Sequence, residues 1–426
     1  MNLEQIGRNT RRLGVGVALA GSFSLAVAQD GNRIEKLETE NSDLKKRLDA
    51  LEQLAQREGL QPAKDGSKAV SAMSGVTLSG FVQASYFFNS NEPKDKKSDG
   101  YLWNTTHNSF SLNKVKITLA SPAVKRSGDE WDAGYRVSMM WGEDAPVLNT
   151  GTPAGGKPPT GLESVREAFV EVNAPVGDGL NIKAGQLISL LNWESGDGGA
   201  ANPNFSQGYQ WYYSGNGPAA GVQVGYTFTD WLTANARVQN GLYAGPVDGN
   251  NGKAVLASLN FKPVKDLWFN LIGFNDSNMA GDTRGGSVIG GYDGTEKLHT
   301  GIEIDYFNFG KTGGKSKDLT TFGAWTWYDL TPKVTLAVRA DYLEDADGGG
   351  IGAPGFRGDP TSQFASSVKA TDPDGHIGSL TMTLNWKPVP RIKIQPEIRY
   401  DYTSYAGGFD GHKSRVIFGV GVNYLF

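Results

Sequence analysis

The chain has 426 residues, a formal net charge of −4, 57 glycines and 11% aromatic residues, and its mean hydropathy is −0.38. The absence of cysteine excludes disulfide bridges, thiolate metal sites and thiol nucleophiles. After the N-terminal segment, no apolar run approaches the ~20 residues that a membrane helix needs, and no long basic run suggests nucleic acid as a partner. If this chain enters a membrane, it does so with strands.

The N-terminus has the features of an export signal. Arginines at positions 8, 11 and 12 precede an apolar run from Leu13 to Val27, and Ala26-Val27-Ala28 is a small-residue triplet suited to cleavage. We predict that residues 1–28 are a bacterial secretory signal peptide and that the mature chain begins near Gln29.

A short helical module is expected over residues 29–58. Its seam side chains recur at alternating intervals of three and four, as in a coiled coil. Charges five residues apart, such as Arg33 and Glu38, are opposite in sign, and Asn41 at an a position fixes register. We predict a parallel homo-oligomerisation helix; the alternative is one amphipathic helix lying on another surface. The seam of this coiled coil consists of Ile34, Leu37, Asn41, Leu44, Leu48 and Leu51.

Residues 59–75, which follow the helix, are predicted to be a linker.

From Val76 onward the hydrophobic period changes to two, which is typical of strands with one apolar face. The final run, Val416 to Phe426, alternates large apolar residues with small or polar ones, as the last strand of an outer-membrane barrel does. Sixteen such runs occur, of which 286–292 is the weakest. They are 76–89, 108–120, 132–142, 163–174, 178–188, 218–228, 231–241, 253–262, 265–275, 286–292, 297–308, 319–328, 332–343, 377–387, 391–403 and 413–426.

The connections between these runs alternate between short turns and long loops rich in Gly and Asp. Short periplasmic turns and long outer loops are characteristic of bacterial barrels. A run of about ten residues, tilted by about 40°, spans roughly 25 Å, the height of the apolar band. We therefore predict an all-β fold: a transmembrane antiparallel β-barrel of about 16 strands over residues 76–426, in the bacterial outer membrane, with the N-terminal helix in the periplasm.

Charged residues fall on the strand faces opposite the apolar ones. A Lys or Arg facing lipid at the bilayer midplane would cost about 2–4 kcal/mol, so these faces are assigned to the lumen. A sixteen-stranded barrel is too wide for side chains to fill, and we expect these charges to be solvated and to line a pore. They are Lys114, Lys116, Arg136, Glu167, Glu171, Lys183, Arg237, Glu303, Asp305, Arg339, Asp341, Lys393, Glu397, Arg399, Asp401 and Arg415.

Two segments carry a resemblance to known proteins. The run from Arg166 to Leu180, continued by Ile182 to Gln186, resembles a hairpin of the OmpL-like "beta-barrel porin-2" family, and so does Ala201 to Ser206 after Trp193-Glu194. The resemblance extends over residues 76–426, and more distantly to phosphate-selective porins. It implies a passive outer-membrane diffusion channel, and for the phosphate-selective porins a trimer.

The loop from Ser189 to Pro218 is the candidate constriction, because it is longer than ordinary loops and follows the early strands. Alternatively, it caps the outside or packs against a neighbouring subunit. The residues proposed to narrow the pore are Trp193, Glu194, Asp197, Tyr209 and Trp211.

Solute preference depends on how the lumen charges are distributed. Lys114, Lys116 and Arg136 on the second and third strands, with Arg399 and Arg415 on the last two, could form a basic wall. Glu303 and Asp305 would face that wall from the eleventh strand. Such a transverse field suits small polar or zwitterionic solutes, and a mild preference for anions such as phosphate or organic acids stays open.

An enzyme is not expected. The four histidines are scattered without ligand spacing, and no Gly-x-Ser-x-Gly motif occurs. The acidic loop 344–376 could hold Ca²⁺, but acidic surface loops are more often simply solvated, so no metal or cofactor is predicted.

The predicted function is an outer-membrane porin for passive diffusion of small polar solutes or ions. Its alternatives are an anion (phosphate)-selective channel and a structural tether or adhesin with a blocked lumen. The expected partners are membrane lipid and further copies of the chain, as a trimer joined through barrel walls and the coiled coil.

Overall fold

The structure is a computed structural model that describes residues 36–37, 39–47, 75–149, 162–214, 217–242, 244, 251–277, 282–312, 315–346, 374–405 and 408–426. The chain divides into two units, Met1–Gly75 and Val76–Phe426. Within the first unit, residues 39–47 are helical and exposed, including Asn41 and Leu44 of the predicted seam. The signal peptide, the other seam residues except Leu37, and most of the linker lie outside the described residues.

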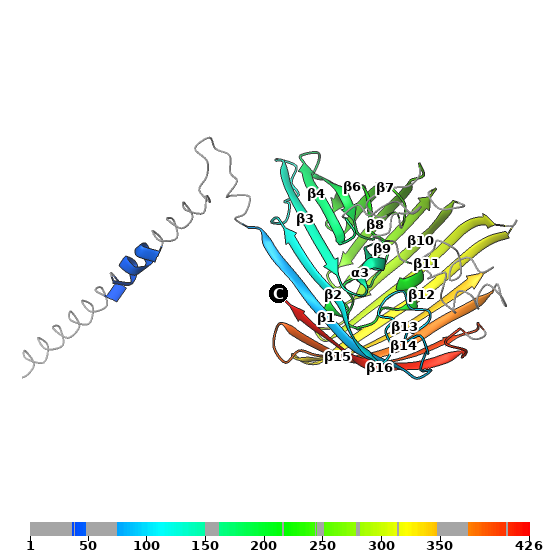
Figure 1. The fold of residues 1–426 in the computed structure, drawn as a ribbon. Coiled ribbons are helices and arrows are strands. Elements are labelled where there is room, and N and C mark those ends of the chain that lie inside the picture. The colour runs from blue at the N-terminus through cyan, green and yellow to red at the C-terminus, as the bar shows by residue number, and fades with distance from the viewer. Residues whose placement is uncertain are drawn as a thin grey trace, which may run out of the picture. The chain divides into compact units, whose positions relative to one another are not determined.

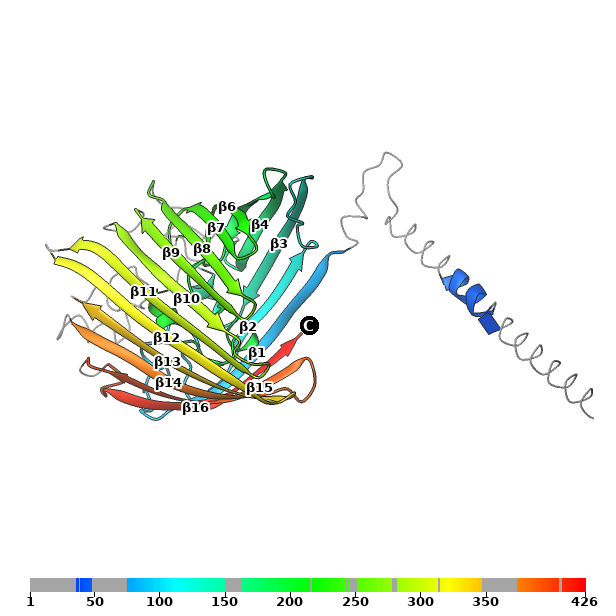
Figure 2. The same ribbon diagram turned by 180° about the vertical axis from the view of Figure 1, so that it is seen from behind.

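The second unit is a closed barrel of sixteen antiparallel strands, with β1 paired to β16 (Figures 1 and 2). The predicted fold is thus confirmed, and the weak run at 286–292 is part of a full strand, β10. The strands are β1 Thr77–Asn89, β2 Ser109–Ala120, β3 Asp132–Trp141, β4 Val165–Ala174, β5 Leu180–Leu187, β6 Ala219–Thr229, β7 Leu232–Gln239, β8 Ala254–Val264, β9 Leu267–Asp276, β10 Thr283–Tyr292, β11 Leu298–Thr312, β12 Lys315–Thr331, β13 Val334–Ala346, β14 Gly375–Trp386, β15 Ile392–Thr403 and β16 Ser414–Leu425.

Side chains along each strand alternate between a buried inner face and an exposed outer face. On β16, Phe418 and Tyr424 face outward and are exposed, whereas Arg415, Ile417 and Asn423 face inward and are buried. This is the polarity expected of a barrel whose outside contacts lipid. In the described parts of the connections lie three short helices: α3 Ala145–Leu148, η1 Gly198–Ala200 and α4 Tyr209–Ser214. Among the described residues, no helix is both long enough and apolar enough to cross a bilayer.

Two bulges break the alternation on the early strands. Between the Gln83 and Ala84 pairings, β2 has one extra residue, and as a result Asn113 and Lys114 are both buried. Between the Ser138 and Met139 pairings, β4 has Arg166 as its extra residue. Bulges re-aim side chains in this way, so Arg166 is buried although strict alternation would point it outward.

Amide side chains form a ladder across the seam where the barrel closes. Gln83 Nε2 on β1 donates to Asn423 Oδ1 on β16, Asn423 Nδ2 donates to Gln395 Oε1 on β15, and Gln395 Nε2 donates to Asn385 Oδ1 on β14, each at 2.8 Å. All four side chains are buried, and buried amides must be hydrogen-bonded in this way to avoid a desolvation penalty. The ladder therefore joins the first strand to the last three.

Candidate functional site: the lumen and its inserted loop

The described residues between β5 and β6, 188–214 and 217–218, fold into the barrel; we name this segment the inserted loop. All six residues of α4 are buried, and the segment hydrogen-bonds to β11, β13, β14, β15 and β16. Each of the five residues predicted to narrow the pore lies in it. The loop therefore occupies the lumen.

Carboxylates of the barrel wall hold the inserted loop by its backbone. Their contacts are Glu303 with the N–H of Trp193 at 2.7 Å, Asp341 with the N–H of Tyr209 at 2.6 Å, and Glu397 with the N–H groups of Phe205 and Ser206 at 2.8 and 3.2 Å. Asp305 instead accepts hydrogen bonds from the side chains of Gln210 and Ser214, at 2.5 and 2.7 Å. Because these hydrogen bonds come from four separate strand positions of the wall and end on the loop, they fix it in position.

Glu194 and Arg339 form a buried ion pair at the centre of the loop. Arg339 Nη1 lies 2.9 Å from Glu194 Oε1, and neither side chain is exposed. Gly208 N–H donates to the other carboxylate oxygen at 2.8 Å, Trp325 Nε1 donates to Oε1 at 3.1 Å, and Arg339 also donates to the Ser206 carbonyl. Each charge thus has the other as its partner, as buried ions require.

The Asn-Pro-Asn stretch at 202–204 packs against the seam ladder. Asn385 Nδ2, at the end of that ladder, donates to the Pro203 carbonyl at 2.8 Å. Beside it, the Phe205 ring lies over Gly421 of β16, where an added Cβ would come within 1.9 Å of the ring. A side chain at this position would displace the ring, so the motif and the small inner face of β16 fit each other.

A second loop, residues 90–108 between β1 and β2, packs onto α4. The Trp103 ring lies edge-on to Trp211 and to Tyr212, with centroids 4.6 Å apart in both pairs. Tyr212 OH donates to the Trp103 carbonyl at 3.2 Å, and Tyr213 OH donates to that of Gly100 at 3.0 Å. Burial raises the pKa of Tyr212 well above its usual value, so its hydroxyl stays protonated as a donor.

Arg399 and Arg415 converge on Asp401 beneath these loops. Their Nε atoms lie 2.6 and 2.8 Å from its carboxylate, and all three side chains are buried. The Tyr101 ring lies 4.6 Å from both guanidinium carbons, and its hydroxyl donates to Asp401 at 3.2 Å. The predicted basic wall is therefore wrong for β15 and β16, because these arginines hold loops in place and do not face water.

The sixteen charged residues predicted to line the pore all lie on the inner face, but few of them are solvated. Only Arg136, Glu171 and Lys183 among the sixteen keep partly exposed side chains, and the others are buried. Glu303 and Asp305 are 0% and 1% exposed, so the predicted opposing acidic wall also lies beneath the inserted loop. The expectation of solvated lumen charges is wrong for these residues because the loop covers them.

Space remains between the inserted loop and the wall of β2–β7. A cavity of about 610 Å³ lies there, which we name the chamber. Phe169, Leu190 and Trp193 contribute partly buried apolar surface to it. Its charged lining consists of Lys116, Arg136, Arg166, Lys183 and Arg237 with Glu167, Glu194 and Asp197.

Several of the chamber's charges are paired. The pairs are Lys116 Nζ with Asp197 at 2.8 Å, Arg136 Nε with Glu167 at 2.6 Å, and Lys183 Nζ with Glu171 at 3.6 Å. Lys114 turns away from the chamber to Asp144, 3.1 Å from its ammonium. Burial raises the pKa of Asp144, and the Lys114 charge opposes that rise. Lys114 therefore anchors the segment after β3.

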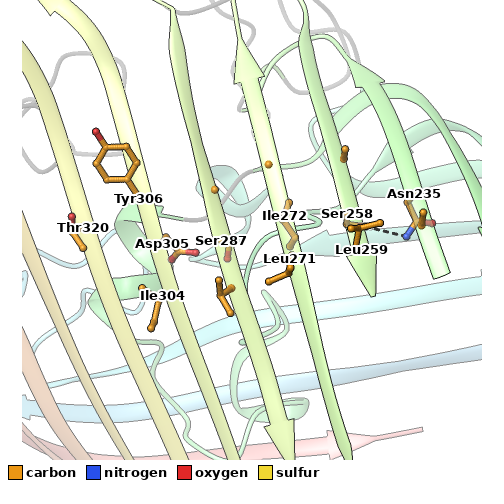
Figure 3. Close-up of a pocket in the computed structure, with 15 residues that line it drawn as sticks. Asn235, Ser258, Leu259, Leu271, Ile272, Ser287, Ile304, Asp305, Tyr306 and Thr320 are labelled. Atoms are coloured by element: carbon orange, nitrogen blue, oxygen red, sulfur yellow. Dashed lines mark hydrogen bonds between the residues drawn. The ribbon is translucent and has the colours of Figure 1, made fainter. Parts of the chain in front are cut away.

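A second hollow, of about 720 Å³, lies on the wall of β7–β12 (Figure 3). Ala257, Gly273 and Gly286 occupy directly paired positions on β8, β9 and β10, and the exposed residues Leu271 and Ile304 stand beside them on the outer face. Because its exposed rim is apolar and faces outward, this hollow belongs to the membrane-facing surface and not to the solute path.

Metal ligands do not gather in the described part of the chain. Within those ranges, no three His, Asp or Glu side chains could hold an ion together. Most of the acidic loop considered for Ca²⁺, residues 347–373, lies outside the described residues.

Comparison with known proteins places the chain in a family. The model of the family described as "Putative beta-barrel porin-2, OmpL-like" matches residues 75–426. The chain belongs to this family. The protein is therefore an outer-membrane porin, a channel for passive diffusion, and both family and fold point to a channel and away from an enzyme. No curated protein matches the sequence.

Three solved structures show the same fold as this porin. The outer membrane channel DcaP of Acinetobacter baumannii has a TM-score of 0.52 and 12% identity, over 82% of this chain and 97% of that one. OmpT of Vibrio cholerae, in its trimer form, gives 0.51 and 11%, over 82% and 99%. An anion-selective porin from Comamonas acidovorans gives 0.51 and 10%, over 82% and 99%.

Some residues of the site could not be found from the sequence pattern. Arg166 is turned inward only by the β4 bulge, and Tyr101 and Trp103 lie in a loop without any periodic signal. The length of the loop between β1 and β2 was its only visible cue.

Proposed function

We propose that small polar solutes cross this porin through the chamber, between the inserted loop and the wall of β2–β7. The observation that carries the proposal is the asymmetry of the lumen. Buried carboxylates tie the inserted loop to β11, β13 and β15, whereas a cavity of about 610 Å³ remains on the other side. In this view the inserted loop is the constriction, and Asp197 and Trp193 stand at its edge.

We further propose that this path prefers anions. Five basic and three acidic side chains line the chamber, and one of the acids, Glu194, is neutralised by Arg339. The Comamonas acidovorans protein of similar fold is described as anion-selective, which is compatible with this preference. Phosphate and organic acids are the natural candidates.

Single-channel recording in planar bilayers tests the path. The native protein should give discrete openings, and replacing residues 197–207 by a short Gly-Ser linker should raise the conductance several-fold, because a bare sixteen-stranded barrel is an open aqueous channel. A Gly-Ser replacement of the short turn at 293–297 is the matched control and should change nothing. Unchanged conductance without the loop segment would reject the constriction. Silence from folded, heat-modifiable native barrels would instead favour the tether or adhesin with a blocked lumen.

Reversal potentials in a salt gradient test the anion preference. Arg136 has a side chain 43% exposed, so Arg136→Glu should shift selectivity toward cations. Lys265→Glu, on the exposed turn between β8 and β9, makes the same change of charge away from the chamber and should leave selectivity as it was. Equal reversal potentials in both variants and the native protein would remove Arg136 from the selective path.

We also propose a homo-oligomer, with the N-terminal helix in the periplasm acting as a coiled coil. Leu37 and Leu44 are 56% and 62% exposed, which leaves their apolar surface available to other copies of the helix. The OmpT structure of similar fold is a trimer form, and we expect the same number here. Sedimentation of a peptide covering residues 29–60 tests the helix, and a strict monomer at high concentration would contradict it.

A further inference from the structure

Arg237, on the chamber side of β7, is a buried cation whose partners are all neutral. It is 5% exposed. Its Nε and Nη2 donate to Gln223 Oε1 at 3.0 and 2.6 Å, and its Nη1 donates to the Ile188 carbonyl at 2.7 Å and to Gln239 Oε1 at 3.3 Å. No carboxylate pairs with Arg237 among the described residues, so an amide stands where a counter-ion would be expected.

Arg166 repeats this arrangement on β4. It is also 5% exposed, and its Nη1 donates to the carbonyl of Leu148. In the described parts of the chain, no ion pair includes Arg166; the charges of Asp197 and Glu167 act on it from beyond ion-pair distance, and these acids are themselves paired with Lys116 and Arg136. Leaving a buried charge without a partner costs several kcal/mol. Two such groups at one cavity therefore make that cavity receptive to an anion from outside the protein.

A third cation lies close by on the neighbouring strands. Arg237, Gln223 and Lys183 occupy directly paired positions on β7, β6 and β5, so all three side chains start from the same level of the wall. Lys183 has a partner at 3.6 Å, Glu171, that lies beyond hydrogen-bond distance, and its ammonium lies 5.0 Å from the centre of the Phe169 ring. The Lys183 ammonium and the apolar Phe169 ring thus lie next to each other in the chamber.

We propose that this part of the chamber binds the carboxylate of a small amphipathic organic acid. The carboxylate is taken by Arg237 with Arg166 and Lys183, and the apolar body of the acid lies against Phe169, Leu190 and Trp193. This inference rests on the proposed function and names the class of anion that the path selects.

The donor count and the apolar lining favour a carboxylate over an inorganic oxyanion. Of the five N–H groups that a guanidinium carries, Arg237 already uses four on Gln223, Ile188 and Gln239. A phosphate, with more oxygens to satisfy, would find too few donors here and would leave the apolar faces in contact with water. A benzoate-like acid matches both features.

The decisive variant is Gln223→Glu, which has nearly the same shape and places a carboxylate beside Arg237. The introduced carboxylate should form an ion pair with Arg237. Binding of benzoate should then weaken by about tenfold or more, equivalent to about 1.4 kcal/mol. Arg237→Gln should weaken it similarly. Lys265→Gln removes one positive charge from an exposed turn and is the control that should bind as the native protein does.

Binding is measured on the purified full-length protein in detergent by calorimetric titration with benzoate and with inorganic phosphate, and in parallel by benzoate block of the chloride current. The calorimetric result does not depend on conduction, so a failed binding site and a failed channel are distinguishable. Saturable benzoate binding, tighter than that of phosphate and lost in Gln223→Glu, supports the proposal. Equal benzoate affinity in all variants, or no preference over phosphate, overturns it. If Arg237→Gln does not fold, Gln223→Glu still decides.

Discussion

The lumen has two halves that use the same residue types in opposite ways. On β11–β16, arginines are paired with carboxylates: Arg339 with Glu194, and Arg399 and Arg415 together with the single carboxylate of Asp401. On β4–β7, Arg166 and Arg237 are held by carbonyl and amide oxygens. The first half pairs its arginines with carboxylates and binds a loop; the second is where we propose that positive charge meets solutes.

This difference shows that an inward-facing charge is not by itself a pore-lining group. Whether it meets water depends on what covers it, and here the inserted loop covers one half. A buried charge that is paired and hydrogen-bonded serves architecture, whereas Arg237, with only neutral partners beside the chamber, is the group that we propose binds an anion.

The largest effect should come from breaking an ion pair in the β11–β16 half of the lumen. Arg339→Met leaves Glu194 buried without its partner, and removal of one member of such a pair typically costs about 3–5 kcal/mol. We expect a loss of this size in the free energy of unfolding, measured by urea denaturation in lipid vesicles, together with larger single-channel conductance as the inserted loop loses its anchor.

Lys183→Met is the matched change in the β4–β7 half of the lumen. The side chains of Lys183 and Glu171 are 27% and 21% exposed and their atoms are 3.6 Å apart, so this pair should contribute about 0–1 kcal/mol at most. If both methionine variants lose the same stability, the distinction between the halves fails. Adding Glu194→Gln to Arg339→Met should restore part of the loss, as coupled sites do.

A second comparison uses two strand glycines on opposite faces. At Gly421 an added Cβ would meet the Phe205 ring at 1.9 Å, whereas at Gly273, on the outer face, it would find nothing within 4 Å. Gly421→Ala should therefore destabilise the barrel by about 1–3 kcal/mol, the usual cost of overpacking, and loosen the inserted loop. Gly273→Ala should be close to neutral. Equal unfolding midpoints for the two variants would show that Phe205 moves aside freely.

The sequence pattern predicted the barrel well and the lumen only in part, for physical reasons. In a barrel wall, side chains point alternately to lipid and to the polar interior, so apolar and polar residues alternate along the sequence. This pattern predicted strands such as β13 and β15, and it predicted that Arg339 and Glu397 point inward. Burial under a loop has no such period. Nothing in the spacing of Arg399 or Glu303 indicates that a loop from elsewhere in the chain lies over them, and a bulge such as that at Arg166 inverts the pattern locally.

The smallest expected effect concerns the loop between β1 and β2, residues 90–108, and depends on pH. His107 is buried, and its Nδ1 accepts the Asn89 N–H at 2.9 Å. Burial lowers the pKa of His107, and the Lys96 charge lowers it further. The folded state therefore favours neutral imidazole, and its stabilisation is complete above the ordinary value of about 6.5 and is lost as the pH falls below it toward the folded-state pKa.

Amide hydrogen exchange measures this effect locally. Protection of residues 98–108 should fall between pH 7.5 and pH 5 after correction for intrinsic exchange, while protection of the inserted loop's contacts with Glu397 and Asp341 changes less. In His107→Gln, whose side chain does not titrate, the pH dependence should disappear because no proton competes for the acceptor position. A native loop equally protected at both pH values would mean that the hydrogen bond to Asn89 contributes nothing to holding it, and that the packing of Trp103 on Tyr212 alone fixes the loop.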